Sequence, residues 1–163
     1  MHDVAQLSDL ARARGLRIAV AESLTSGTLA ETIGAGEGAG EWFGGGIVAY
    51  LTEVKERVLG LEPGTDPCSA ACAEQLARAT RELFDADLTV STTGVGGPDA
   101  EGGHPPGTVY VGWATRTRVG HRLLTLDGDP EQVLAATIDA AVRMLVFHAL
   151  ESDVADRESQ LSG

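Results

Sequence analysis

The spacing of apolar residues along the chain predicts alternating helices and strands. Near the N-terminus, apolar residues recur every three or four positions and stop at Gly15, as in an amphipathic helix that ends on glycine. Short apolar runs bounded by glycine and polar residues are typical of buried strands. The expected helices cover residues 3–14, 23–33, 52–60, 70–84 and a last segment that begins at 129–130. The expected strands cover residues 16–21, 46–51, 87–94, 107–116 and 119–126.

This order of elements predicts an α/β fold, a three-layer α/β/α sandwich with a mixed, mostly parallel sheet. The last two expected strands, between residues 107 and 126, form an antiparallel hairpin. Asp129 followed by Pro130 predicts the start of the last helix, because an N-cap residue followed by proline at the first helical position favours a helix. Trp42 and Phe43 are expected to anchor a glycine-rich stretch in the core.

The length of 163 residues fits one domain with a substantial core. We expect this domain to cover residues 1–151 and the polar segment 152–163 to be disordered. The N-terminal residues lack the apolar centre of a signal peptide, and no uninterrupted apolar run is as long as a membrane span. A cytoplasmic location without a membrane partner is therefore the expectation.

The formal net charge of −12 disfavours binding to nucleic acid or to an anionic membrane. No basic stripe interleaved with aromatic residues appears in the sequence, so the expected partner is a small molecule. Cys68 and Cys72 are expected to be reduced, structural thiols, because two cysteines without a secretory signal seldom form a disulfide. The four histidines are scattered along the chain, and no metal site is expected.

Lys55 is the single lysine of the chain, beside eleven arginines. Arginine can supply surface charge as well as lysine does, but it cannot release its proton near neutral pH. A lysine retained in this background is therefore a candidate for proton transfer. The competing interpretation is a lysine that persists by chance on a solvated helix face.

Three polar segments follow expected strands, at the edge where open α/β sheets bind ligands. They are A-E-S-L-T-S-G at 21–27, Y-L-T-E-V-K at 50–55, and S-T-T-G-V-G-G-P-D at 91–99 with G-H-P-P-G-T-V at 103–109. If the first two junctions share a crevice, Ser23 could serve as nucleophile, helix N–H groups could stabilise an oxyanion, and a desolvated Lys55 could serve as base. The alternatives are that Ser23 or Thr25 is an N-cap, that Tyr50 is a core residue, and that the glycine loop is a long turn.

Taken together in this order, these segments resemble the C-terminal domain of the CinA (competence/damage-inducible) family over roughly residues 5–150. The segments F-G-G-G-I-V-A-Y, L-G-L, P-G-T-V-Y-V-G and L-D-G-D also belong to the resemblance. It implies an α/β/α sandwich, commonly a homo-oligomer, and a serine amidohydrolase that needs no metal or other cofactor. The family includes deamidases of nicotinamide mononucleotide, so the implied reaction converts this or a related pyridine carboxamide to the acid and ammonia.

The resemblance also implies roles for individual residues. Ser23 would be the nucleophile, Lys55 the general base, and Tyr50 would orient or polarise this pair. The implied substrate-binding residues are Thr25, Gly27, Thr93, Gly94, Gly96 and Gly97, of which Thr25 and Gly27 would shape the helix N-terminus.

Several positions depart from the family pattern. Ser26 replaces a glycine of the first motif, and Leu51 and Thr52 replace the usual Ser-Asn after the tyrosine. Pro130 and, approximately, Leu134 stand where the family has arginines, which are plausible partners of a substrate phosphate. The missing arginines, together with Leu51 and Thr52, motivate a competing hypothesis, a divergent nucleotide-binding module without catalysis. A structural or partner domain within a larger assembly is a third hypothesis. Arg57 and Arg122 could replace the arginines if the fold brings them near.

Overall fold

The computed structural model describes the backbone of residues 2–161 and the side chains of residues 3–152. Within that part of the chain, five strands form one mixed sheet in the order β2-β1-β3-β4-β5. β1 pairs parallel with β2 and β3, whereas β4 pairs antiparallel with β3 and β5. The strands are β1 (Ile18–Glu22), β2 (Phe43–Val48), β3 (Leu88–Gly94), β4 (Thr108–Thr115) and β5 (Val119–Thr125). The predicted mixed sheet and its hairpin are confirmed, but two of the four strand pairings are parallel and two antiparallel, so the sheet is not mostly parallel.

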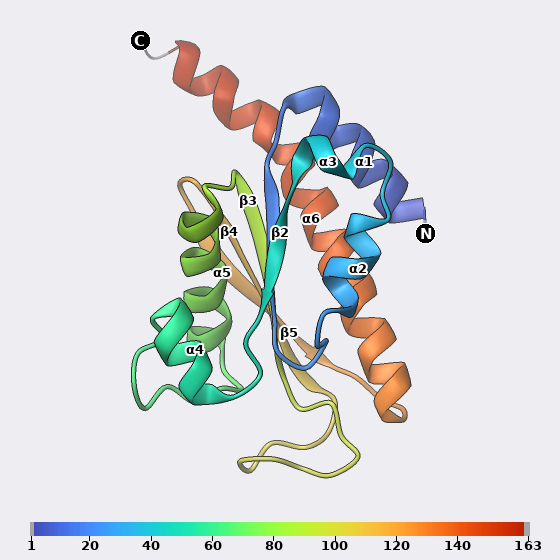
Figure 1. Cartoon of the computed structure of the whole chain (residues 1–163), viewed down its shortest axis with the longest axis vertical. Helices are drawn as coiled ribbons and strands as arrows, with labels where there is room; N and C mark the ends of the chain where they lie inside the picture. Colours follow the sequence, from blue (N-terminus) through green and yellow to red (C-terminus); the bar gives the residue numbers. More distant parts are fainter. Residues whose placement is uncertain (1, 162–163) are drawn as a thin grey trace.

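Helices cover both faces of the sheet, as Figure 1 shows, so the three-layer architecture is also confirmed. One face carries α1 (His2–Arg14), α2 (Thr28–Gly34), α3 (Ala39–Trp42) and α6 (Pro130–Leu161). The other carries α4 (Thr52–Leu59) and α5 (Ala70–Phe84). The larger core cluster contains Leu7, Val20, Ile33 and Leu145, and the smaller contains Leu59, Leu61, Cys72 and Leu76. Trp42 belongs to the larger cluster and Phe43 packs against it, as expected.

β2 occupies an edge of the sheet and lies earlier in the chain than predicted. It begins at Phe43 and ends at Val48, so Tyr50 lies beyond the strand rather than at its end. The apolar pattern misplaced it because glycines disfavour strands, yet here they are required. A Cβ at Gly46 would lie 2.8 Å from Cγ2 of Val20 on the neighbouring strand.

α6 begins where the sequence predicts it. Asp129 Oδ1 accepts a 2.9 Å hydrogen bond from the Gln132 N–H, and Gln132 Oε1 accepts one of 2.9 Å from the Asp129 N–H, which is a reciprocal capping box. The helix backbone continues to Leu161, into the segment for which the sequence predicts disorder. Half of residues 152–161, namely Ala155, Arg157, Glu158, Gln160 and Leu161, have a high helix propensity. Residues 162 and 163 of that predicted tail lie outside the described residues.

Part of α6, Pro130–Ser152, is long and apolar enough to cross a membrane by length and composition, with a mean hydropathy of 1.7. Asp139 and Arg143 interrupt its apolar residues, so the segment contains no uninterrupted apolar run of that length. Those two side chains form an ion pair of 3.0 Å one helical turn apart. The inner face, which includes Ala141 and Leu145, is fully buried, as in the core helix of a folded domain.

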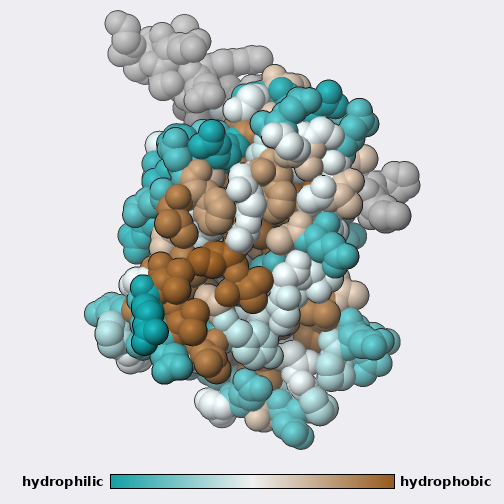
Figure 2. Space-filling view, in the orientation of Figure 1, coloured by the Kyte–Doolittle hydropathy of each residue, from teal (hydrophilic) through white to brown (hydrophobic). Residues whose placement is uncertain are grey.

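The surface seen in Figure 2 carries apolar residues over α4 and the adjoining parts of α5 and β2. Exposed apolar side chains of these elements and of the β2–α4 connection include Val48, Leu51, Val58 and Leu83. The homo-oligomer implied by the family resemblance stays a prediction.

Candidate active site

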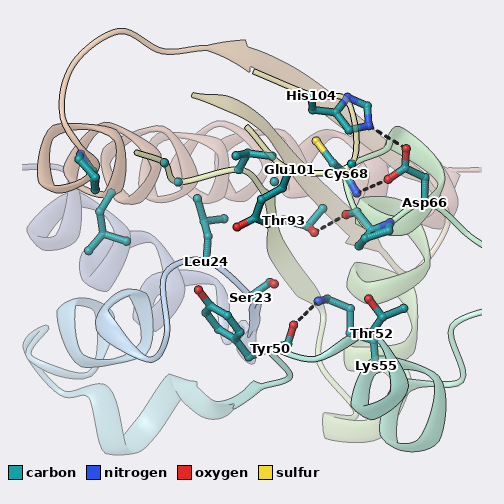
Figure 3. Close-up of a pocket in the computed structure, with 18 residues that line it drawn as sticks. Ser23, Leu24, Tyr50, Thr52, Lys55, Asp66, Cys68, Thr93, Glu101 and His104 are labelled. Carbon is teal, nitrogen blue, oxygen red and sulfur yellow. Dashed lines mark hydrogen bonds and ion pairs between the residues drawn. The ribbon is translucent and has the colours of Figure 1, made fainter. Parts of the chain in front are cut away.

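A cavity of about 450 Å³ opens at the carboxyl ends of β1 and β3. Its walls come from the turn after β1, the connection from β2 into α4, the segment before α5, the loop after β3 and the first turns of α6. Residues far apart in the chain meet there because parallel neighbouring strands end at the same edge of the sheet. Figure 3 shows this arrangement.

Ser23 is the first residue after β1 and lines the cavity with 7% of its surface exposed. Its N–H donates a 3.1 Å hydrogen bond to the Thr92 carbonyl, so the serine backbone stays tied to β3. The preceding residue, Glu22, is buried and turns its carboxylate toward the start of α2. Glu22 Oε1 accepts from the Leu29 N–H at 2.8 Å, and Oε2 accepts from the Ala30 N–H at 3.1 Å.

The N-terminus of α2 does not have the expected role, in which its N–H groups would stabilise an oxyanion beside Ser23. α2 begins at Thr28 rather than near Ser23, and Glu22 already occupies the N–H groups of its first turn. Residues between Ser23 and Thr28 form a tight turn in which Ser26 and Gly27 have φ angles of 50° and 103°. The sequence pattern missed this turn because Ser23, Thr25 and Ser26 all resemble N-cap residues, whereas the N-cap is Gly27.

Lys55 lies on the second turn of α4 and is 2% exposed, among the largest fully buried side chains of the described residues. Its Nζ donates a 2.7 Å hydrogen bond to the Tyr50 carbonyl oxygen. Burial lowers the pKa of the Lys55 amine, and the nearby Cys72 opposes that shift. The surface-lysine alternative is therefore wrong: the one lysine of the chain is a desolvated amine facing a cavity.

Figure 3 shows the Ser23 hydroxyl and the Lys55 amine pointing toward one another from opposite sides of the cavity floor. Tyr50 contributes in a different way from the expected one. Its side chain is 61% exposed, which also excludes the core alternative, and its ring lies on the Ser23 side of the cavity. The main-chain carbonyl of Tyr50, rather than its phenol, holds the lysine.

The glycine loop after β3 supplies the facing wall, through Thr93, Gly94, Gly96 and Gly97. Thr93 donates its hydroxyl proton to the Pro67 carbonyl. Gly94 has a φ of 142°, and a Cβ there would collide with the Thr108 backbone oxygen, so glycine is required. The N–H groups of Gly96 and Gly97 make no hydrogen bond within the described part of the chain.

Two expected substrate-binding residues lie away from the cavity wall. The Thr25 hydroxyl is fully buried and shares a 2.8 Å hydrogen bond with the Thr92 hydroxyl. Gly27 caps α2, and a Cβ built there would meet Val48. Both residues shape the turn that presents Ser23, and neither lines the cavity.

Sequence reasoning missed an acidic rim. Asp66 and Glu101 both line the cavity, and His104 Nε2 lies 2.8 Å from Asp66 Oδ2. The hydrogen bond with His104 lowers the pKa of Asp66, which therefore stays ionised. These residues come from irregular segments without periodicity. The length of the glycine- and proline-rich loop could have indicated Glu101 and His104, whereas Asp66 lies in the segment between α4 and α5 and gave no such signal.

Pro130 and Leu134, the positions where arginines were expected, do line the cavity. Arg57, exposed on α4, and Arg122, exposed on β5, do not line it. Neither therefore replaces the expected arginines.

Cys68 and Cys72 are buried free thiols. Burial raises the pKa of Cys72, and burial together with Asp66, Cys72 and Glu101 raises the pKa of Cys68 to about 11. Across the described residues, no three His, Cys, Asp or Glu side chains group closely enough to hold a metal ion.

Comparison with known proteins identifies the family of the chain. The family model described as the CinA C-terminal domain matches residues 2–148. The chain belongs to the CinA C-terminal domain family. A competence-damage inducible protein of Geobacillus kaustophilus is 47% identical over 117 residues, covering 68% of this chain and 28% of the relative. Its counterpart from Limosilactobacillus fermentum is 38% identical over 151 residues, covering 89% of this chain and 36% of the relative.

Solved structures of the CinA superfamily share the fold. A Klebsiella pneumoniae protein superposes with a TM-score of 0.88 at 27% identity, covering 92% of this chain and 97% of that one. An Escherichia coli protein superposes with a TM-score of 0.85 at 30% identity, covering 91% and 88%. The chain spans about a third of the length of the two curated relatives, and nearly all of these two CinA structures.

Proposed function

We propose that this CinA domain is a metal-independent amidohydrolase that acts on nicotinamide mononucleotide or a related pyridine carboxamide, with Ser23 as nucleophile and Lys55 as general base. One observation carries the proposal: a serine hydroxyl and a desolvated lysine amine face each other in one cavity. A serine needs a base to become nucleophilic, and a buried amine with a lowered pKa can serve as one.

The reaction follows from this placement. Ser23 Oγ attacks the carboxamide carbon while Lys55 Nζ takes the hydroxyl proton. Lys55 then gives that proton to the amide nitrogen, the C–N bond breaks, and ammonia leaves an acyl ester on Ser23. Water attacks the ester and passes a proton through Lys55 back to Ser23 Oγ, which releases the carboxylic acid.

Stabilisation of the oxyanion is assigned to the glycine loop. Gly96 and Gly97 line the cavity, and their N–H groups lack intramolecular acceptors in the described chain, so they are the donors we propose. Removal of one such donor typically costs about 10²–10³ in kcat.

Ammonia release from nicotinamide mononucleotide, its riboside and nicotinamide tests the proposal, with the Ser23→Ala variant as control. We expect turnover of at least one amide by the natural chain and its loss in the variant. Turnover of none of these amides would reject the amidase. Thermal shifts with pyridine nucleotides in the absence of turnover would instead favour the binding module.

A further inference from the structure

The cavity that holds Ser23 and Lys55 presents carboxylates to any bound molecule. Asp66 and Glu101 both line it, and Figure 3 shows Glu101 reaching over the cavity from the loop after β3. In the described part of the chain, the Glu101 carboxylate forms no hydrogen bond or ion pair. Its negative charge is therefore uncompensated at the cavity wall.

Basic groups that could offset this charge are already engaged. Among the described residues, Lys55 and His104 are the basic side chains of the cavity wall, and no arginine lines it. The Lys55 amine donates to the Tyr50 carbonyl, and burial favours its neutral form. His104 pairs with Asp66 at 2.8 Å, so any positive charge on its ring is matched there.

The long helix that begins at the cavity, α6, offers few free N–H groups to an anion. A helix N-terminus attracts a phosphate through free N–H groups and the helix dipole. Here the first helical residue is Pro130, which has no N–H, and the Gln132 N–H is taken by Asp129. Glu131 adds a further negative charge in the same turn.

The pKa of Cys68, in the cavity wall, also shows the effect of the negative charges of Asp66 and Glu101. Both Asp66 and Glu101 disfavour its thiolate and thereby add to the effect of burial on its pKa. A phosphate placed near this thiol would meet the same two charges, in a chain whose net charge is −12.

We infer that the substrate of this cavity is a phosphate-free pyridinium carboxamide, a nucleoside rather than a nucleotide. The inference rests on the proposed amidase and narrows its substrate. An N-ribosylated pyridine carboxamide carries one positive charge on its ring, which Glu101 and Asp66 attract. A 5′-phosphate adds nearly two negative charges, and among the described residues no cationic side chain of the cavity wall is free to pair with them.

The test compares kcat/KM for nicotinamide riboside and nicotinamide mononucleotide at low and high salt. We expect kcat/KM for the riboside to exceed that for the nucleotide at least about tenfold. The cavity lacks a charge-assisted contact to the phosphate, and one such contact changes affinity by about one to two decades. Salt should reduce the preference, because it screens the repulsion of the phosphate.

Two variants sharpen the comparison. Glu101→Gln should reduce the preference about threefold, as expected for one carboxylate acting through water-like surroundings. Leu134→Arg, which places a guanidinium on the cavity wall, should raise kcat/KM for the nucleotide about tenfold or more. Glu82→Gln removes an equal charge from an exposed position on α5 outside the cavity and should leave the preference unchanged.

Equal or better turnover of the nucleotide would overturn the inference and leave the amidase intact. If neither compound is turned over, the proposed amidase activity is rejected. Calorimetric measurement of the binding of both compounds to the Ser23→Ala variant then tests the charge preference independently of activity. Tighter binding of the riboside would then support the charge preference. Tighter binding of the nucleotide, or binding of neither compound, would overturn it.

Discussion

Nζ of Lys55 donates a 2.7 Å hydrogen bond to the main-chain carbonyl of Tyr50, five residues earlier in the chain. A neutral amine that gives one proton to this carbonyl keeps its lone pair free for another partner. Because the carbonyl belongs to the backbone at the entry of α4, the amine is fixed by the fold itself. The lone pair can then face the Ser23 hydroxyl, toward which the side chain points.

Lys55→Arg separates basicity from charge. The guanidinium keeps a positive charge but does not release its proton at neutral pH, so we expect kcat/KM to fall by about 10²–10⁴. In the natural chain, kcat/KM should rise with pH through a pKa below 10.5, because burial lowers the pKa of this amine. Steady-state kinetics from pH 6 to 10 measure both effects; a variant that keeps more than about a tenth of the activity would contradict the assignment.

Lys55→Met should stabilise the fold while it removes activity. Folding lowers the pKa of Lys55 below its ordinary value of 10.5, so the unfolded chain binds the proton more tightly. The natural protein therefore loses stability as pH falls from 10.5 to the folded pKa, and the loss is constant below it. Denaturant unfolding should show that the methionine variant has a larger free energy of unfolding than the natural protein at pH 7. This difference should shrink as the pH rises toward 10.5, and a difference that grows with pH would refute the explanation.

Tyr50→Phe should leave the catalytic pair intact. The hydrogen bond to Lys55 comes from the main chain, which the substitution does not change. We expect kcat to change less than about threefold, whereas KM can rise if the phenol contacts the substrate. A loss of kcat comparable to that of Ser23→Ala would show that the hydroxyl takes part in the chemistry.

Glu22→Gln should destabilise the protein by about 1.5–3 kcal/mol, because it weakens two hydrogen bonds from N–H groups in the first turn of α2 to the buried carboxylate. Glu31→Gln is the matched control, since that exposed carboxylate lies in the first turn of the same helix. The control should cost less than about 1 kcal/mol. Urea unfolding measures both, and equal costs would argue against Glu22 as the cap of α2.

Ser26→Gly should raise stability by about 0.5–1 kcal/mol. Ser26 has a φ of 50°, which costs a residue with a Cβ about 1–2 kcal/mol, and the added freedom of glycine in the unfolded chain offsets part of the gain. Ser26→Ala keeps the strain and should change stability little. Thermal unfolding distinguishes the two; a destabilised glycine variant would mean that the serine hydroxyl holds the turn.

Much of the fold follows from local sequence. The apolar run that forms β1, the amphipathic pattern of α5 and the Asp129–Pro130 start of α6 each express a preference of neighbouring residues. The elements placed wrongly are those in which tertiary contacts override that preference. β2 uses glycines because Val20 lies against Gly46, and α2 starts late because the chain first turns through Ser26 and Gly27.

The sequence by itself determined that a serine and the single lysine follow two strands, because strand patterns and residue counts are local properties. Only the tertiary structure decided that the lysine amine is buried against the Tyr50 carbonyl, that Glu22 occupies the start of α2, and that Asp66 and Glu101 line the cavity. Burial and charge at a site depend on segments far apart in the chain, and those segments meet because parallel strands end at one edge of the sheet.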